Sequence, residues 1–287
     1  MIIKTILAGL SGGSASDSVI ELACRLAEQF AAYVEGLHVR IDAGELVIAA
    51  GAEGLAAATS MGLTDQLLAE AMEKAKHLQQ AFMAAATRHG LALHSEATAA
   101  GPGVSWRVES GDAPAIVASR ARFFDLAVLG RSDRVVNQPH TDVIEETLLH
   151  SGRPVLLAPS EPPPAFGERI AIGWNGSDEA VRSVTASLPF LRRARDVVLV
   201  ELGDSDKAGT ADMQAYLLML GIASRSRKLR DVRGANVGTE LLSTAADEGA
   251  DLLVLGGYSR SPLRQSVFGG TTRQVLAASR LPLLMAH

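Results

Sequence analysis

The sequence predicts an α/β protein made of two similar halves, each a five-stranded parallel sheet flanked by helices. Short runs of β-branched and aliphatic residues alternate with stretches of helical periodicity, which is typical of βαβ units around a parallel sheet. The chain also repeats itself. Residues 125–130 (DLAVLG) recur as 251–256 (DLLVLG), and residues 153–158 (RPVLLA) recur as 281–286 (LPLLMA). Such a repeat in a chain of 287 residues indicates two domains of one kind.

A proline-rich segment separates the two repeats. Residues 160–168 (SEPPPAFGE) contain three consecutive prolines, which favour a stiff, extended connector and cannot belong to a helix interior or a central strand. We therefore assign residues 1–160 to a first domain, 161–168 to a linker and 169–287 to a second domain.

The first half carries an insertion that the second half lacks. The opening segments 5–9 and 169–173 lie 164 residues apart, whereas segments 125–130 and 251–256 lie 126 apart, so the first half holds 38 extra residues. They fall around residues 41–68, a stretch rich in Ala and Gly. Two interpretations stay open: a surface elaboration packed on a neighbour, or a mobile lid or partner-binding flap. The lid interpretation predicts weak protection from hydrogen exchange there.

The periodicity predicts ten strands and three helices with one apolar face. The strands are expected over residues 2–8, 33–39, 104–109, 126–129 and 155–158 in the first half, and over 170–172, 197–202, 224–229, 252–255 and 283–286 in the second. The apolar faces comprise Val19, Ile20, Ala23, Leu26, Ala27 and Phe30 in a first helix, Leu68, Ala71, Ala75, Leu78, Phe82 and Ala85 in a long helix over 65–89, and Val181, Val184, Leu188 and Leu191 in the second half.

Composition excludes several classes of partner. A net charge of −5 and an aromatic content of 4% argue against a nucleic-acid surface or an anionic membrane surface, because both need clustered Lys and Arg. The single cysteine, Cys24, excludes an internal disulfide framework and lies in a helical apolar stripe, so we expect a buried, inert thiol. No signal peptide and no apolar run of membrane-spanning length is visible, and a cytoplasmic location is expected. The seven histidines are scattered without a metal-binding spacing.

The most informative segment is a glycine-rich loop in the second half. Gly256 and Gly257 end a buried strand, Arg260 lies in a basic and hydroxylated loop, and Gly269 and Gly270 open the next helix. Backbone N–H groups at such a helix N-terminus form an anion site that suits phosphates. The alternative is that these glycines only turn the chain and permit tight packing.

This loop resembles that of the universal stress protein family, in which G-x-x-G, nine residues and G-[S/T] bind the phosphates and ribose of ATP. Gly256 matches the first glycine, and Ser259 replaces the second. Gly269 matches the third, Gly270 stands where Ser or Thr is expected, and Thr271 follows it.

The turn after the first strand of the second half also resembles the family. Residues 174–179 (WNGSDE) are similar to the family's Val-Asp-Gly-Ser-Glu turn, with Asn175 in place of the acid and Ser177 retained. Trp174 beside this turn is expected to pack at a strand end or to border a ligand.

The resemblance covers the chain twice and implies a tandem universal stress protein. It implies Rossmann-like domains of the adenine nucleotide alpha hydrolase-like type, which join through their last strands, 155–158 and 283–286, as an intramolecular pseudo-dimer; a homodimer of the whole chain is left open. We expect two separate sheets and not one continuous sheet.

The resemblance further implies a degenerate ATP or adenine-nucleotide pocket in the second half. Asn175, Ser177, Gly256, Gly257, Ser259, Arg260, Gly269, Gly270 and Thr271 would form it. Because a non-glycine residue at Ser259 disturbs a loop that favours glycine, affinity should be micromolar to millimolar, about −8 to −4 kcal/mol. Gly269→Val should abolish binding. Whether Mg²⁺ accompanies the nucleotide, or another small molecule takes its place, is left open.

The first half departs further from the family. Its loop over residues 131–140 is two residues shorter, and Thr141 and Asp142 stand in place of the glycine pair. A carboxylate there caps the helix, but it places a negative charge where a phosphate would bind. We expect no nucleotide site in the first half.

Two motifs in the first half suggest an enzyme instead. Residues 9–13 (GLSGG) satisfy the G-x-S-x-G pattern of hydrolases, and residues 11–18 (SGGSASDS) are similar to the phosphate loop of ATP pyrophosphatases, two residues too long. Ser16 or Asp17 is explained more simply as a helix N-cap. Since no positioned base, metal pair or nucleophile emerges, we expect a stress-response binding or regulatory module. The alternatives are a slow ATPase or pyrophosphatase-like enzyme, and a purely partner-binding protein.

Overall fold

The computed structural model describes most of the chain. The described residues are 2–13, 15–40, 63–94, 101–131, 142–202, 209–229, 237–257 and 270–287. Most of the predicted insertion, and Ser259, Arg260 and Gly269 of the glycine-rich loop, lie outside these ranges.

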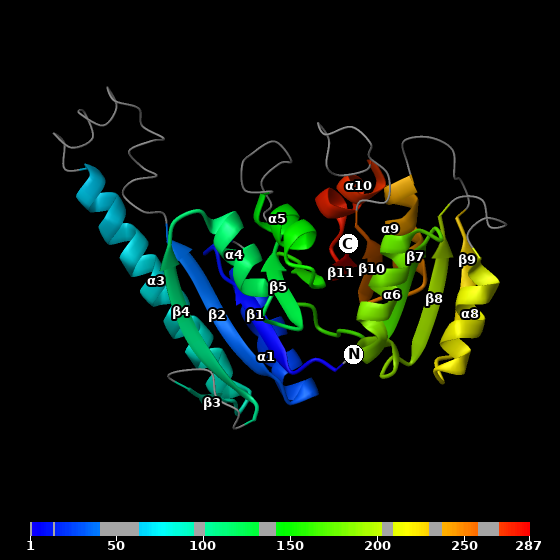
Figure 1. The fold of residues 1–287 in the computed structure, drawn as a ribbon, viewed down its shortest axis with the longest axis horizontal. Coiled ribbons are helices and arrows are strands. Elements are labelled where there is room, and N and C mark those ends of the chain that lie inside the picture. The colour runs from blue at the N-terminus through cyan, green and yellow to red at the C-terminus, as the bar shows by residue number, and fades with distance from the viewer. Residues whose placement is uncertain are drawn as a thin grey trace.

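The strands form one sheet whose two halves are each internally parallel (Figure 1). They are β1 (Thr5–Gly9), β2 (Tyr33–Arg40), β3 (Ala92–Leu93), β4 (Gly103–Ser110), β5 (Leu126–Gly130), β6 (Val155–Ala158), β7 (Arg169–Trp174), β8 (Asp196–Glu201), β9 (Arg225–Lys228), β10 (Leu252–Gly256) and β11 (Leu283–Ala286). Their order is β3-β4-β2-β1-β5-β6-β11-β10-β7-β8-β9. The fold class and all ten predicted strands are confirmed, while the short edge strand β3 was missed.

The expectation of two separate sheets is wrong. The last strands of the two halves pair antiparallel, with Leu157 opposite Leu283 and Val155 opposite Met285. Both strands are fully apolar and buried, so neither can serve as a solvated edge. Pairing them hydrogen-bonds both backbones and fuses the halves into one 11-stranded sheet.

Helices cover both faces of this sheet. They are α1 (Ser16–Phe30), α3 (Leu63–Arg88), α4 (Ala113–Ala121), α5 (Asp142–His150), α6 (Asp178–Leu191), α8 (Thr210–Met219), α9 (Val237–Asp247) and α10 (Gly270–Ala278). One core layer joins the sheet to α1, α3, α6 and α8, and the other joins it to α4, α5, α9 and α10. The parallel strands are therefore buried on both sides, as βαβ connections require.

The predicted helix faces are largely correct, with one exception. In α6, Ala180, Ser183, Val184 and Leu188 are buried, whereas Val181 is 43% exposed, so its assignment to the inner face is wrong. At the start of this helix the buried positions are held by the small residues Ala180 and Ser183, while the predicted Val184, Leu188 and Leu191 are buried as expected. Hydrophobicity alone therefore misassigned Val181.

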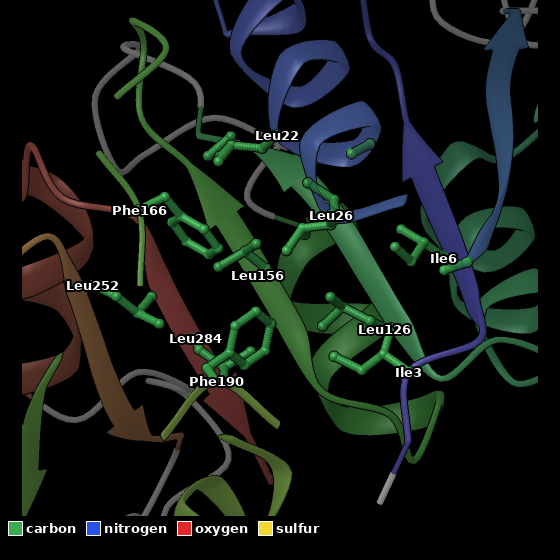
Figure 2. Close-up of a cluster of buried hydrophobic side chains, with 14 of the residues drawn as sticks. Ile3, Ile6, Leu22, Leu26, Leu126, Leu156, Phe166, Phe190, Leu252 and Leu284 are labelled. Carbon is green, nitrogen blue, oxygen red and sulfur yellow. The ribbon is translucent and has the colours of Figure 1, made fainter. Parts of the chain in front are cut away.

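Aromatic rings join the two halves at the centre of the molecule (Figure 2). Phe166 of the segment before β7 lies edge-on to Phe190 of α6 at 5.8 Å between ring centroids, and Phe30 of α1 contacts the same ring at 5.3 Å. Arg25 of α1 also donates a hydrogen bond to the Pro163 carbonyl at 3.0 Å. The connector is thus docked onto both halves, while the domain boundaries stay a prediction.

The structure also tests the expectation of a buried, inert cysteine. Cys24 is fully buried, and burial raises the pKa of its thiol to about 12, so it is inert as a nucleophile. Among the described helices, none has the length and hydropathy to cross a membrane. The described residues also contain no cluster of His, Cys, Asp or Glu that could hold a metal ion.

Candidate functional site

The strand order of the second half has a switch point between β7 and β10. From β7 the chain proceeds outward to β8 and β9, then returns to the other side of β7 as β10 and β11. In open α/β sheets, ligands bind outside the carboxyl ends of the strands at such a switch. Asn175 directly follows β7, and Gly256 ends β10, so the structure brings these two predicted site residues to this point.

The turn after β7 is held by its own side chains. The Ser177 N–H donates to Asn175 Oδ1 at 3.1 Å, and Gly176 has a φ of +71°, a left-handed conformation that favours glycine. Ser177 is the N-cap of α6, where its Oγ accepts a hydrogen bond from the Ala180 N–H at 3.2 Å. Asn175 and Ser177 therefore fix the start of α6 at the switch point.

The described glycines of the loop fall into two groups. A Cβ on Gly256 would lie 2.6 Å from the Ala180 backbone nitrogen, and one on Gly257 would lie 2.8 Å from the Leu148 side chain across the joint between the halves. Tight packing accounts for both. A Cβ on Gly270, at the start of α10, would meet no atom within 4 Å among the described residues. Packing against the described residues therefore does not explain Gly270, and the neighbouring Thr271 is partly exposed at the same helix start.

The structure adds a residue that sequence reasoning missed. Glu201 ends β8, opposite Trp174 of β7 in the register, and is only 5% exposed. Its Oε2 is buried and has no hydrogen-bond partner in the described part of the chain. An acid at the end of the apolar run DVVLVE is the signal that could have found it. A buried, unsatisfied carboxylate oxygen at the ligand-binding edge of the sheet marks a polar site.

The first half fills the corresponding region with its own side chains. Lys74 of α3 packs against Gly12 of the loop after β1. His38, at the end of β2, hydrogen-bonds through Nδ1 to the Leu10 carbonyl at 2.6 Å. The N-cap of α1 is Ala15, which offers no side-chain cap, so the assignment of that role to Ser16 or Asp17 is wrong.

The Ser16 hydroxyl is used elsewhere in the same loop. It accepts a hydrogen bond from the Gly12 N–H at 3.0 Å.

Arg131 after β5 reaches across the joint between the halves, where its Nη1 lies 3.5 Å from the Leu276 carbonyl of α10. Asp142 is the first residue of α5, so the predicted position of this carboxylate at a helix start is confirmed.

Fold and topology define an α/β protein of two doubly wound halves fused through their last strands. Comparison with known proteins adds a family whose model matches part of the chain, and solved structures with the same fold. Residues 227–287, which span α9, β10, α10 and β11, match the model of the universal stress protein family. A universal stress protein from Archaeoglobus fulgidus DSM 4304 is similar in structure, with a TM-score of 0.71, 14% identity, and coverage of 98% of this chain and 95% of the other.

A second solved structure agrees in fold. It is a functionally unknown protein from Pseudomonas aeruginosa PAO1, with a TM-score of 0.57, 14% identity, and coverage of 99% of this chain and 92% of the other. No curated protein sequence is significantly similar. The predicted resemblance to the family is thereby confirmed: residues 227–287 match the family model, and the chain has the fold of a solved universal stress protein over nearly its whole length.

Proposed function

We propose that the second half binds an adenine nucleotide or a related small phosphate ligand weakly at the β7/β10 switch point, and that the protein acts as a binding or regulatory module in the stress response. The observation that carries this proposal is the placement of Asn175, Gly256 and Glu201 at one edge of the sheet, beside the open helix start at Gly270.

The spacing of the strands suits a nucleotide. β10, β7 and β8 are consecutive neighbours, so the ends of β10 and β8 lie about 10 Å apart at the usual strand spacing. Phosphates at the backbone N–H groups of Gly270 and Thr271 would meet the positive end of the α10 dipole. The base would then extend toward Glu201, whose unpartnered oxygen can accept a hydrogen bond from an exocyclic amino group.

Calorimetric titration with ATP tests the pocket. Gly270→Val projects a branched side chain into open space, so it should abolish binding without lowering the melting temperature. Asp142→Ala, at the corresponding helix start of the first half, is the matched control and should leave binding unchanged. Absence of heat at millimolar ATP, or binding that survives Gly270→Val, contradicts the proposal and favours a partner-binding protein.

A nucleotide series tests the role of Glu201. ITP lacks the exocyclic amino group of ATP, so the protein should prefer ATP by about tenfold, the value of one hydrogen bond to a charged group. Glu201→Met keeps the length of the side chain and removes the acceptor, which should abolish the preference. Equal affinity for ATP and ITP in the native protein would contradict the proposed orientation of the base.

Turnover separates a binding module from the enzymatic alternatives. A binder should release neither phosphate nor pyrophosphate from ATP in the steady state. Release that is lost on changing Ser11, Gly12 or Gly13 would instead support the pyrophosphatase-like interpretation of the first half.

A further inference from the structure

One side chain joins the helix that carries the proposed phosphate site to its neighbour. α9 and α10 pack against each other on one face of the sheet (Figure 1). Gln274, one turn after Gly270 in α10, accepts a hydrogen bond through its Oε1 from the Gly238 N–H of α9 at 2.9 Å. Gly238 is the second residue of α9, so its N–H has no partner within its own helix. Gln274 therefore caps the start of α9 from the neighbouring helix.

Gly238 lets the two helices approach closely at this point. A Cβ on Gly238 would lie 2.6 Å from the Gln274 Cβ and 2.9 Å from the Thr271 carbonyl oxygen, so any side chain there would force the helices apart. Thr271 is one of the two residues whose backbone N–H groups are proposed to bind phosphate. The contact between the helices therefore lies on the first turn of α10, where the proposed site is.

The position of Gln274 on α10 suits this role. Residues four apart on a helix share a face, and helical side chains lean toward the N-terminus, so Gln274 extends along the turn that begins at Gly270. Its amide presents the oxygen to Gly238, because a backbone N–H can only donate. Loss of this oxygen would leave the buried Gly238 N–H without its acceptor.

The corresponding helices of the first half are held in a different way. α4 is capped by its own Asp112, whose Oδ2 accepts a hydrogen bond from the Ala115 N–H at 3.3 Å. Glu146 is the fifth residue of α5, as Gln274 is of α10, and its Oε1 lies 3.5 Å from Nδ1 of His150 in the same helix. A cap from the neighbouring helix thus occurs in the half with the proposed site, whereas in the other half the helix is capped by its own N-cap residue.

We propose that Gln274 is a positioning residue of the nucleotide site, an inference that rests on the function proposed above. By tying the start of α9 to α10, Gln274 holds the Gly270 and Thr271 N–H groups where one phosphate meets both. Donors that are already in place bind a ligand more tightly, because the cost of ordering them is not subtracted from the free energy of binding. Gln274 itself does not touch the nucleotide.

Calorimetric titration with ATP measures the effect on binding. Gln274→Met keeps the length of the side chain and removes the acceptor, so it should weaken ATP binding by about fivefold, the value of one hydrogen bond. Gln214→Met is the matched control, because Gln214 of α8 donates to the Ser224 carbonyl at 3.1 Å and α8 packs on the other face of the sheet. It should lower the melting temperature to a similar extent and leave ATP affinity unchanged. Both variants are titrated well below their melting temperatures.

Nuclear magnetic resonance of the unliganded protein tests the positioning directly. First-turn amides of a helix usually exchange quickly, yet the Gly238 N–H should be protected in the native protein. The protection should be lost in Gln274→Met and kept in Gln274→Glu, which retains an acceptor. The amide resonances of Gly270 and Thr271 should move in Gln274→Met and stay in place in Gln214→Met.

Gly238→Ala tests the same contact from the other helix. The added methyl group forces α9 away from α10 while Gln274 is retained, so ATP binding should weaken by a similar factor. Because both substitutions act on one contact, the double variant should bind ATP no more weakly than the weaker of the two single variants. Gly238→Ala also replaces Gln274→Met in every measurement if the latter does not fold.

The outcomes separate this inference from the proposed function. If the native protein does not bind ATP, the proposed function fails and the positioning role fails with it. If the native protein binds ATP but Gln274→Met binds it equally well, or Gln214→Met weakens binding as much, only the positioning role is contradicted. Unmoved Gly270 and Thr271 resonances in unliganded Gln274→Met contradict it whether or not ATP binds.

Discussion

The two halves share one strand order but differ in how they satisfy their polar groups. At the carboxyl ends of the strands of the first half, Lys74 packs over Gly12 and His38 forms a hydrogen bond with the Leu10 carbonyl. At the corresponding edge of the second half, within the described residues, Glu201 Oε2 has no hydrogen-bond partner and a Cβ on Gly270 would meet no atom within 4 Å. The two copies of one scaffold therefore differ in which polar groups at this edge have partners, and the proposed site of the second half lies where the first half places its own side chains.

The halves also differ in how deeply they bury a charged pair. In the first half, Glu35 is 3% exposed and receives two hydrogen bonds of 2.7 Å from Arg120, which raise the pKa of that guanidinium. In the second half, Arg225 and Asp196 form a pair of 2.7 Å at the surface, which lowers the pKa of Asp196. The buried pair holds a structure together, whereas the exposed pair protects an edge strand.

The largest expected effect is the loss of the buried pair. Arg120→Ala leaves the Glu35 carboxylate buried beside Arg107 alone, and should lower the free energy of unfolding by about 3 kcal/mol. Arg225→Ala at the exposed pair should cost about 1 kcal/mol or less. Urea denaturation of both variants measures the difference. Equal losses of stability in the two variants would contradict the difference between the buried and the exposed pair. In the double variant Glu35→Met and Arg120→Met, which leaves no buried charge at this position, most of the stability should be recovered.

Two equivalent serines give the next comparison. Ala15 and Ala180 each pack against the glycine that ends a strand, and a serine follows three residues later in each helix. Ser183 Oγ donates to the Leu255 carbonyl at 3.0 Å and accepts from the Ala286 N–H at 2.9 Å, whereas Ser18 Oγ is buried with no hydrogen-bond partner among the described residues.

Alanine substitution should therefore act in opposite directions. Ser183→Ala leaves a buried N–H unsatisfied and should cost about 2 kcal/mol, while Ser18→Ala removes an unsatisfied hydroxyl and should be neutral or slightly stabilising. Thermal or urea unfolding of the two variants measures this. A destabilising Ser18→Ala would show that its hydroxyl has a partner in solution.

The smallest expected effect concerns pH. Burial is the main cause that lowers the pKa of His38, and the positive charges of Lys74 and Arg40 act in the same direction. Because the unfolded chain binds this proton more readily than the folded one, the free energy of unfolding should fall as the pH drops through about 6.5. His38→Gln should reduce that slope, and His77→Gln, in the exposed face of α3, should not. An unchanged slope in His38→Gln would assign the effect to other groups.

The sequence by itself determined the secondary structure and the repeat. Strands such as Val155–Ala158 and Leu283–Ala286 are apolar throughout, and local periodicity was sufficient to find them and to recognise two βαβ halves. It also placed Asn175 and Gly256 at strand ends, where a parallel sheet binds ligands. These features depend on residues close together in the chain, and the resemblance to a family rested on the same local motifs.

Only the tertiary structure decided which of these residues have partners. The antiparallel pairing of β6 with β11, the burial of Glu201 and the packing of Lys74 against Gly12 all depend on segments distant in sequence. Whether a polar atom is satisfied depends on what the fold brings within about 3 Å of it, and no local pattern records that distance. For this reason, the proposed site in the second half rests on Glu201 Oε2, an atom without a hydrogen-bond partner among the described residues.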